Sequence, residues 1–118
     1  MKFLIQRVTE ASVEIDGKIV GEIGKGFFVL IGVSASDTEA EADKLLKKMF
    51  GLRIFADSEG KTNLSLADVG GSVLLVSQFT LYADCKKGNR PSFIKAGPPD
   101  HAKALYDYIV EGARKYAE

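Results

Sequence analysis

The segment that most constrains the fold is FFVLIGV, residues 27–33, in which every residue except one glycine is apolar. Successive side chains of a strand point to opposite faces of a sheet, so a strand with this sequence is apolar on both faces. It is therefore expected to be a central strand that is covered on both sides. A second apolar run, VLLV at residues 73–76, predicts another long strand that continues into SQFT at residues 77–80.

The rest of the chain predicts short strands and two helices. An Asp-Gly pair within residues 12–23 is a strong signal for a two-residue hairpin turn. Ser36 with Glu39 three residues later has the form of a capping box at the start of a first helix. Residues 98–117 have the apolar spacing of a second amphipathic helix. The order β-β-β-β-α-β-β-α predicts an α+β fold, with mainly antiparallel curved sheets that approach a barrel and two helices packed outside.

Composition restricts the class of protein. The 118 residues are 46% apolar and 27% charged, which is ordinary for a globular chain and predicts a single domain over residues 1–118. Sixteen basic and sixteen acidic residues cancel, which argues against a protein that coats nucleic acid non-specifically, so no DNA partner is expected. A lone cysteine, Cys85, and the lack of any apolar stretch of membrane length favour a cytoplasmic protein with no membrane partner.

The usual catalytic sets are absent from the sequence. The one histidine, His101, lies next to Asp100 and is expected to be an exposed residue in the first turn of the second helix. A Ser-His-Asp set built on Ser77 or Ser92 would need this histidine, and neither serine lies in a Gly-x-Ser-x-Gly elbow. No His, Cys or carboxylate cluster has the spacing of metal ligands, so no metal and no other cofactor are expected.

A basic cluster lies in the second half of the chain. Lys86, Lys87, Arg90 and Lys95 occur in a segment, residues 85–99, that contains no acidic residue. Such a run is most often a solvated loop. The alternative is a patch that contacts phosphates, because the charge of a neutral chain is concentrated here. The residues alone leave both interpretations open.

The polar end of the strand predicted at residues 73–80 also has two interpretations. Ser77 and Phe79 would lie on one face, with Gln78 and Thr80 on the other. Burial of these polar groups without partners would cost roughly a few kcal/mol in total. Either they bond to neighbouring loops, or the strand leaves the core and lines a small polar pocket. In the second case rigid backbone N–H groups would face a ligand, where they are good donors to an oxyanion.

Several segments, in order along the chain, resemble those of the D-aminoacyl-tRNA deacylase family. They are IQRV at residues 5–8, GLRIF at 51–55, SQFTLYAD at 77–84 and KKGNRPSF at 86–93. The resemblance implies a cytoplasmic homodimer with its sites at the dimer interface. It implies hydrolysis of the ester that joins a D-amino acid, or glycine, to the terminal adenosine of a mischarged tRNA.

The same resemblance implies roles for particular residues. Ser77, Gln78, Phe79 and Thr80 would form the catalytic site, with main-chain N–H groups near Phe79 and Thr80 holding the scissile carbonyl or its oxyanion. The reactive oxygen would be the 2′-hydroxyl of the tRNA ribose in place of the Thr80 hydroxyl. Arg7 would brace the element that selects the chirality of the substrate.

The basic loop would then contact the tRNA near its acceptor end. The residues expected to bind substrate are Arg7, Lys86, Lys87, Arg90 and Phe93. Phosphate contacts of this kind add affinity without reading bases.

The chain departs from the family pattern in one respect. The family carries a Gly-Pro dipeptide in an Asn-x-Gly-Pro segment near its C-terminus, which excludes L-amino acids. The Gly-Pro here, Gly97-Pro98, opens the second predicted helix, and that role is not assigned to it. The domain is therefore expected to be C-terminally incomplete. The alternatives to a deacylase are a non-catalytic module that binds aminoacyl-tRNA ends, an editing-type domain of a synthetase, and a structural protein whose SQFT segment only satisfies the core.

Overall fold

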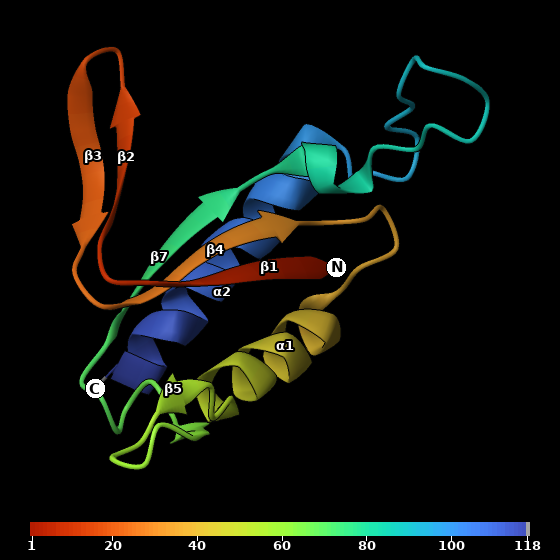
Figure 1. Ribbon diagram of the computed structural model, residues 1–118. Helices are drawn as coiled ribbons and strands as arrows, with labels where there is room; N and C mark the ends of the chain where they lie inside the picture. The colour runs from red at the N-terminus through yellow and green to blue at the C-terminus, as the bar shows by residue number, and fades with distance from the viewer. Residues whose placement is uncertain (118) are drawn as a thin grey trace.

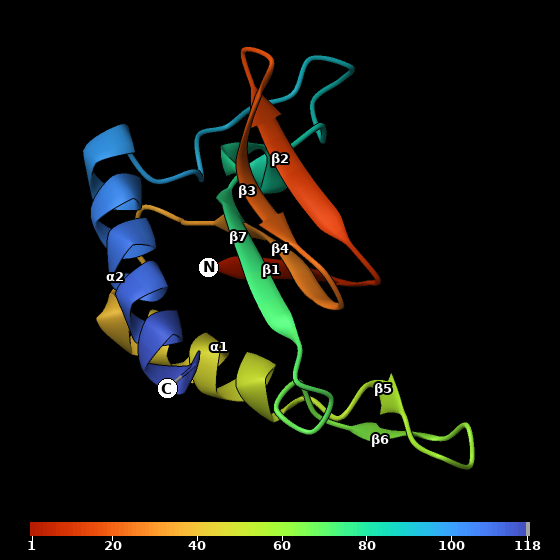
Figure 2. The ribbon, with the colours of Figure 1, turned by 90° about the vertical axis from the view of Figure 1, so that its left-hand side faces the viewer.

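A computed structural model describes residues 1–117 of the chain. The fold is α+β, as predicted, with two long helices on one face of a three-stranded sheet (Figure 1, Figure 2). The elements in chain order are β1 (Lys2–Val8), β2 (Ala11–Ile15), β3 (Lys18–Ile23), β4 (Gly26–Gly32), α1 (Glu39–Gly51), β5 (Phe55–Ala56), β6 (Thr62–Leu64), β7 (Ser72–Ser77), the 3₁₀ helix η1 (Phe79–Tyr82) and α2 (Pro99–Ala117).

The apolar segment of residues 27–33 forms the central strand β4, as predicted. β1 pairs with it antiparallel on one side and β7 pairs with it parallel on the other. The parallel pairing follows from the connection, because the chain passes from β4 through α1 before it returns in β7. Three of the four strand pairings are antiparallel, so the expectation of mainly antiparallel sheets is correct, and the pairing of β7 with β4 is the exception.

The core lies between this sheet and the two helices. Phe27, Val29 and Ile31 point from β4 into the core and are fully buried, and Phe27 stacks on Phe55 with ring centroids 5.3 Å apart. The other face of β4 carries Phe28 and Leu30, which are only half-buried. The prediction that β4 is covered on both sides is thus correct for the helical face and wrong for the other.

The predicted hairpin is β2–β3, and it projects from the sheet (Figure 2). Asp16 and Gly17 form its turn with φ angles of 52° and 79°, a left-handed pair that glycine and aspartate tolerate well. Because β2–β3, β5–β6 and β1–β4–β7 form separate sheets, the described residues close into no barrel. The barrel-like curvature expected from the sequence is therefore not confirmed within residues 1–117.

The cap of the first helix lies two residues later than predicted. Thr38 is the N-cap residue, and Glu41 completes the capping box by accepting hydrogen bonds from the Thr38 backbone N–H at 2.7 Å and from its hydroxyl. Ser36 and Glu39 were the wrong pair, because Asp37 is turned into the protein to bind the N-terminus and the helix can begin only after it. α1 ends at Gly51.

Candidate active site

The polar segment SQFT lies at the point where β7 ends. The strand stops at Ser77, and the N–H of Gln78 makes the last bond to the sheet, to the Ile31 carbonyl at 2.7 Å. Phe79 then begins the short helix η1. Of the two interpretations of this segment, the structure agrees with the one in which the strand ends and the chain leaves the sheet. The predicted alternation of faces through Thr80 is wrong, because a 3₁₀ turn replaces the strand after Ser77.

The switch from strand to 3₁₀ helix leaves two backbone N–H groups without an acceptor. Neither the N–H of Phe79 nor that of Thr80 has a hydrogen-bond acceptor within residues 1–117. They are the first amides of η1, and a 3₁₀ helix supplies no acceptor to its first turn. The side chains do not cap them, since the Gln78 amide instead donates to the Thr80 hydroxyl. Both amides are held rigidly, because β7 fixes η1 at one end and the Ala83 N–H bonds to the Thr80 carbonyl at the other.

A hollow of about 520 Å³ adjoins this turn. Phe79 and Phe93 form one wall, packed edge to face with ring centroids 5.0 Å apart. The remaining lining residues are Ser77, Ala96, Gly97, Pro99, Ala102, Lys103 and Tyr106. The lining is largely aromatic and aliphatic, so the expectation of a small polar pocket is wrong for the side chains, and the polar groups near it are chiefly those of the backbone.

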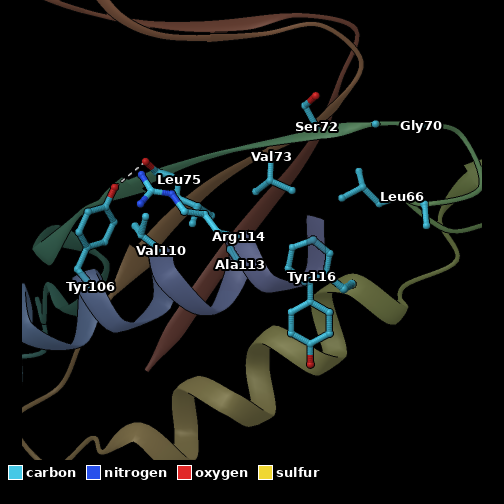
Figure 3. Close-up of a pocket in the computed structure, with 13 residues that line it drawn as sticks. Leu66, Gly70, Ser72, Val73, Leu75, Tyr106, Val110, Ala113, Arg114 and Tyr116 are labelled. Carbon is cyan, nitrogen blue, oxygen red and sulfur yellow. Dashed lines mark hydrogen bonds between the residues drawn. The ribbon is translucent and has the colours of Figure 1, made fainter. Parts of the chain in front are cut away.

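Tyr106 closes one end of the hollow. Its hydroxyl donates to the Leu75 carbonyl at 2.8 Å, on the edge of β7 that faces away from β4. Burial, with a smaller contribution from the charge of Asp107, raises the pKa of Tyr106. The ring separates the hollow from a larger one of about 790 Å³, which lies between β7 and the second half of α2 (Figure 3). None of the candidate catalytic or substrate-binding residues proposed from the sequence lines that larger hollow.

The basic cluster lies on a loop that extends from the body of the protein (Figure 1). Its base is closed by Asp84 and Ser92, whose backbones exchange two hydrogen bonds of 2.7 Å. Lys86, Lys87 and Arg90 are exposed, and none of the ion pairs found within residues 1–117 includes them. Of the residues expected to bind substrate, only Phe93 is brought next to the SQFT segment.

Arg7 lies away from that segment in the described chain. It pairs with Phe27 near one end of the sheet, whereas Ser77 is paired with Ile31 near the other. The Arg7 guanidinium donates to the Ile54 carbonyl at 2.7 Å and stays exposed.

Two residues that the sequence reasoning missed hold η1 in place. The ammonium of Lys2 donates to the Leu81 carbonyl at 2.9 Å and lies 4.7 Å from the centre of the Tyr82 ring. Gly32 allows η1 to approach β4, because a Cβ there would lie 2.9 Å from that of Leu81. A glycine inside an apolar strand was a signal for such a close approach, whereas nothing in the sequence pointed to Lys2.

His101 is not the exposed residue that was expected. It is half-buried, and its Nε2 is fully buried with no hydrogen-bond partner within the described residues. The ring packs at the start of α2 beside Gly97, where a Cβ would lie 3.3 Å from the ring. No acidic or hydroxyl partner orients it as a catalytic base would require.

Neither a metal centre nor a membrane span is found in residues 1–117. No three His, Cys, Asp or Glu side chains are grouped closely enough there to hold a metal ion. No helix in this range is both long and apolar enough to cross a bilayer.

Comparison with known proteins gives a consistent result. The family model described as D-Tyr-tRNA(Tyr) deacylase matches residues 4–118. The chain is 52% identical over 115 residues to D-aminoacyl-tRNA deacylase of Thermosipho melanesiensis, covering 98% of this chain and 77% of the relative. It is 56% identical over 112 residues to D-aminoacyl-tRNA deacylase of Escherichia coli O1:K1 / APEC, covering 95% of this chain and 77% of the relative.

A solved structure described as c-Myc DNA Unwinding Element Binding Protein is also similar. It superposes with a TM-score of 0.92 at 41% identity, covering 98% of this chain and 78% of the other. The match of a family model to nearly the whole chain, with relatives above 50% identity, decides the family. The chain belongs to the D-Tyr-tRNA(Tyr) deacylase family.

Proposed function

We propose that the protein is a proofreading hydrolase that cleaves the ester of D-aminoacyl-tRNA and mischarged glycyl-tRNA, releasing the amino acid and tRNA. Curated relatives above 50% identity carry the name D-aminoacyl-tRNA deacylase, which supports this activity. The resemblance of the SQFT segment to the family's motif supports an assignment of the reaction to this segment. Ser77, Gln78, Phe79 and Thr80 are the residues that we assign to it.

The main structural support for ester hydrolysis is the pair of free backbone N–H groups at Phe79 and Thr80. Hydrolysis of an ester passes through a tetrahedral intermediate whose oxygen is negatively charged. Two rigid N–H donors beside a largely apolar hollow stabilise that charge more strongly than water does. Removal of one such donor typically lowers a rate by about 10²–10³-fold.

No activated nucleophile accompanies these amides. The Thr80 hydroxyl accepts a hydrogen bond from the Gln78 side chain, and no histidine or carboxylate is bonded to it within the described residues. An aminoacyl ester is already labile, so positioning and oxyanion stabilisation are sufficient to accelerate its hydrolysis. In this proposal the tRNA 2′-hydroxyl assists a water molecule that attacks the ester carbonyl. The oxygen of that water stays in the released amino acid, the 3′-oxygen leaves as the tRNA hydroxyl, and the protein needs no base of its own.

The exposed loop supplies affinity for the nucleic acid. Lys86, Lys87 and Arg90 carry unpaired positive charge on a loop whose base leads into Phe93 at the hollow. Phosphates of the acceptor end bound by this loop would direct the terminal adenosine toward the SQFT turn. Such contacts fix position and do not read sequence.

Assembly and location are further parts of the proposal. We propose a cytoplasmic homodimer in which the exposed face of the sheet, with Leu4 49% exposed, takes part in the contact between copies. Strands of two copies side by side would supply the barrel-like curvature that one chain lacks. Arg7 would then approach a site through the partner, because it lies far from the site within its own chain.

The direct test is to incubate the protein with D-tyrosyl-tRNA and with L-tyrosyl-tRNA. We expect release of the D-amino acid and survival of the L-ester. Hydrolysis of neither, in a preparation shown to be folded by circular dichroism, would overturn the proposal. A substrate ending in 2′-deoxyadenosine tests the second part, because loss of the 2′-hydroxyl should abolish most of the acceleration.

A pair of variants isolates the Phe79 amide. Phe79→Ala removes the ring and keeps the N–H, whereas Phe79→Pro removes both. Gln78 has extended backbone angles (φ −145°, ψ 95°), which suit a residue before proline, and proline is tolerated in the first turn of a helix. We expect Phe79→Pro to be about 10²–10³-fold slower than Phe79→Ala. Equal rates would remove this amide from the mechanism.

The 41% identical structure, described as a c-Myc DNA Unwinding Element Binding Protein, suggests DNA binding as a second candidate function. The exposed basic loop would also fit DNA phosphates. Competition distinguishes the two, since a tRNA acceptor-stem minihelix should displace labelled tRNA at far lower concentration than duplex DNA of equal length. Binding of tRNA without hydrolysis would instead favour a non-catalytic module or a synthetase editing-type domain.

A further inference from the structure

The amino terminus of the chain forms an ion pair with a buried carboxylate. The Met1 ammonium lies 2.8 Å from Oδ1 and 2.7 Å from Oδ2 of Asp37, and the side chains of Met1 and Asp37 are 1% and 7% exposed. Asp37 is the only polar or charged residue that is buried among the described residues. A charge in such a place is tolerated only when it is paired, so each partner requires the other.

Asp37 connects this ion pair to one wall of the candidate site. Its Oδ2 also accepts the Ser34 N–H at 2.7 Å, which fixes the turn after β4. That turn holds the loop before α2, because Ser34 forms a β-bridge with Ala96 and the Val33 carbonyl accepts the Gly97 N–H at 2.7 Å. Ala96 and Gly97 line the hollow beside Phe79.

Lys2, the next residue in the chain, connects the terminus to η1 on the other side of the hollow. Lys2 donates to the Leu81 carbonyl and lies over the Tyr82 ring, so it holds the C-terminal half of η1. The ammonium of Met1 fixes where Lys2 begins its strand. One end of the chain therefore positions both the loop at residues 93–97 and the helix that carries the free amides.

We propose that the free, unmodified α-ammonium of Met1 is a positioning group of the candidate site. An acyl group on this nitrogen, or a residue placed before Met1, removes the positive charge that pairs with Asp37. Asp37 then becomes an unpaired buried carboxylate, and the turn at Ser34 and the start of β1 both shift. The expected loss of deacylation rests on the proposed function, whereas the expected shift of the Ser34 turn and of β1 does not.

The test compares a Gly-Ser dipeptide added before Met1 with the same dipeptide added after Glu118. Backbone amide shifts are recorded by NMR, with Leu81 and Gly97 reporting on the two walls and Asn63 in β6 as a distant reference. We expect the N-terminal addition to move Leu81 and Gly97 and to lower the Tm by about 10 °C. The C-terminal addition should change neither. Unmoved Leu81 and Gly97 amides in the N-terminally extended protein would overturn the proposal.

Asp37→Asn provides a second test that needs no extension. It should shift the same two amides in the unextended chain and lower the Tm. In the extended chain it should not lower the Tm and is expected to raise it, because it removes a buried carboxylate that has lost its partner. Equal losses of Tm in both backgrounds would show that Asp37 acts independently of the terminus, and would contradict the proposal. Deacylation by each variant is measured separately, so a failure of the proposed function leaves the structural result intact.

Variants at Lys2 distinguish a positioning role from an effect on general stability. Lys2→Arg should retain the bond to the Leu81 carbonyl and the contact with Tyr82, whereas Lys2→Met should lose both. We expect Lys2→Met to lower kcat about 10-fold with little change in KM, and Lys2→Arg to restore most of it. Equal kcat values for the two variants would remove Lys2 from the positioning role.

Discussion

Phe79 and Phe93 pack edge to face across the mouth of the hollow, with ring centroids 5.0 Å apart and ring planes at 66°. Phe79 belongs to the helix that carries the free amides, and Phe93 to the end of the basic loop. The contact therefore connects the element assigned to chemistry with the element assigned to tRNA binding. Phe79 nevertheless stays 57% exposed, which leaves much of its ring available to a ligand.

The first prediction concerns this pair. Phe93→Ala should lower kcat/KM for D-aminoacyl-tRNA at least 10-fold, because the loop loses its contact with η1 and the substrate loses an apolar wall. A double-mutant cycle with Phe79→Ala should give a coupling energy of about 1 kcal/mol in stability. Ile94→Ala is the matched control, since Ile94 is 85% exposed and should be neutral in both measurements.

The second prediction concerns Gly32, which allows η1 to approach β4. Gly32→Ala places a methyl group 2.9 Å from Leu81 Cβ and 3.1 Å from the Tyr82 ring, so η1 must move outward. We expect a loss of about 1–3 kcal/mol in the free energy of unfolding and a larger proportional loss of deacylation. Gly51→Ala is the control, because a Cβ there meets nothing within 4 Å. Unchanged activity in Gly32→Ala would show that the position of η1 is not critical.

The sequence predicted those parts of the fold that depend on local patterns. The period of apolar residues gave the central strand at 27–33 and both helices, and the Asp16-Gly17 pair gave the hairpin. Local patterns fail where a distant residue competes for the same group. Ser36 and Glu39 satisfy the capping-box pattern as well as Thr38 and Glu41 do. In the structure Asp37, between the two candidate caps, binds the distant Met1 ammonium, and the helix is capped by Thr38.

The candidate site was predictable only in part. The change from VLLV to SQFT located the point where β7 leaves the core, and the resemblance supplied its role. The 3₁₀ turn was not predictable from alternation, because it depends on the approach of η1 to Gly32 and on the Lys2 contact from the other end of the chain. The place of Arg7 at the far end of the sheet follows from strand register, which a single sequence does not reveal.

The third prediction uses the salt dependence of tRNA binding. Replacing Lys86, Lys87 and Arg90 together by Gln should weaken tRNA binding and reduce the slope of log K against log salt concentration by about 2–3, since each lost phosphate contact contributes roughly 0.7–0.9. Replacing Lys44, Lys47 and Lys48 on α1 by Gln changes the net charge equally and should leave the slope nearly unchanged. Equal effects of the two triple variants would indicate a response to net charge alone.

The fourth prediction concerns stability in acid. Burial raises the pKa of Asp37, but the hydrogen bond to the Met1 ammonium, the hydrogen bonds from Ser34 and the charge of the ammonium outweigh it, so its pKa lies below the ordinary 3.8. A carboxyl whose pKa is lower in the folded state stabilises the protein above its unfolded pKa, and that contribution is lost as the pH falls through the folded pKa. We therefore expect the free energy of unfolding, measured in urea, to fall as the pH is lowered below about 5.

Asp37→Asn should flatten this acid decline while lowering stability at neutral pH, because the variant has no carboxylate to protonate. One proton taken up on unfolding accounts for a slope of at most about 1.4 kcal/mol per pH unit, so the difference in slope between the two proteins should not exceed that value. Glu14→Gln, on the exposed hairpin, provides the comparison and should retain the parent slope. A parent and an Asp37→Asn variant with parallel curves from pH 6 to pH 3 would contradict the assignment of this carboxyl as a paired, buried anion.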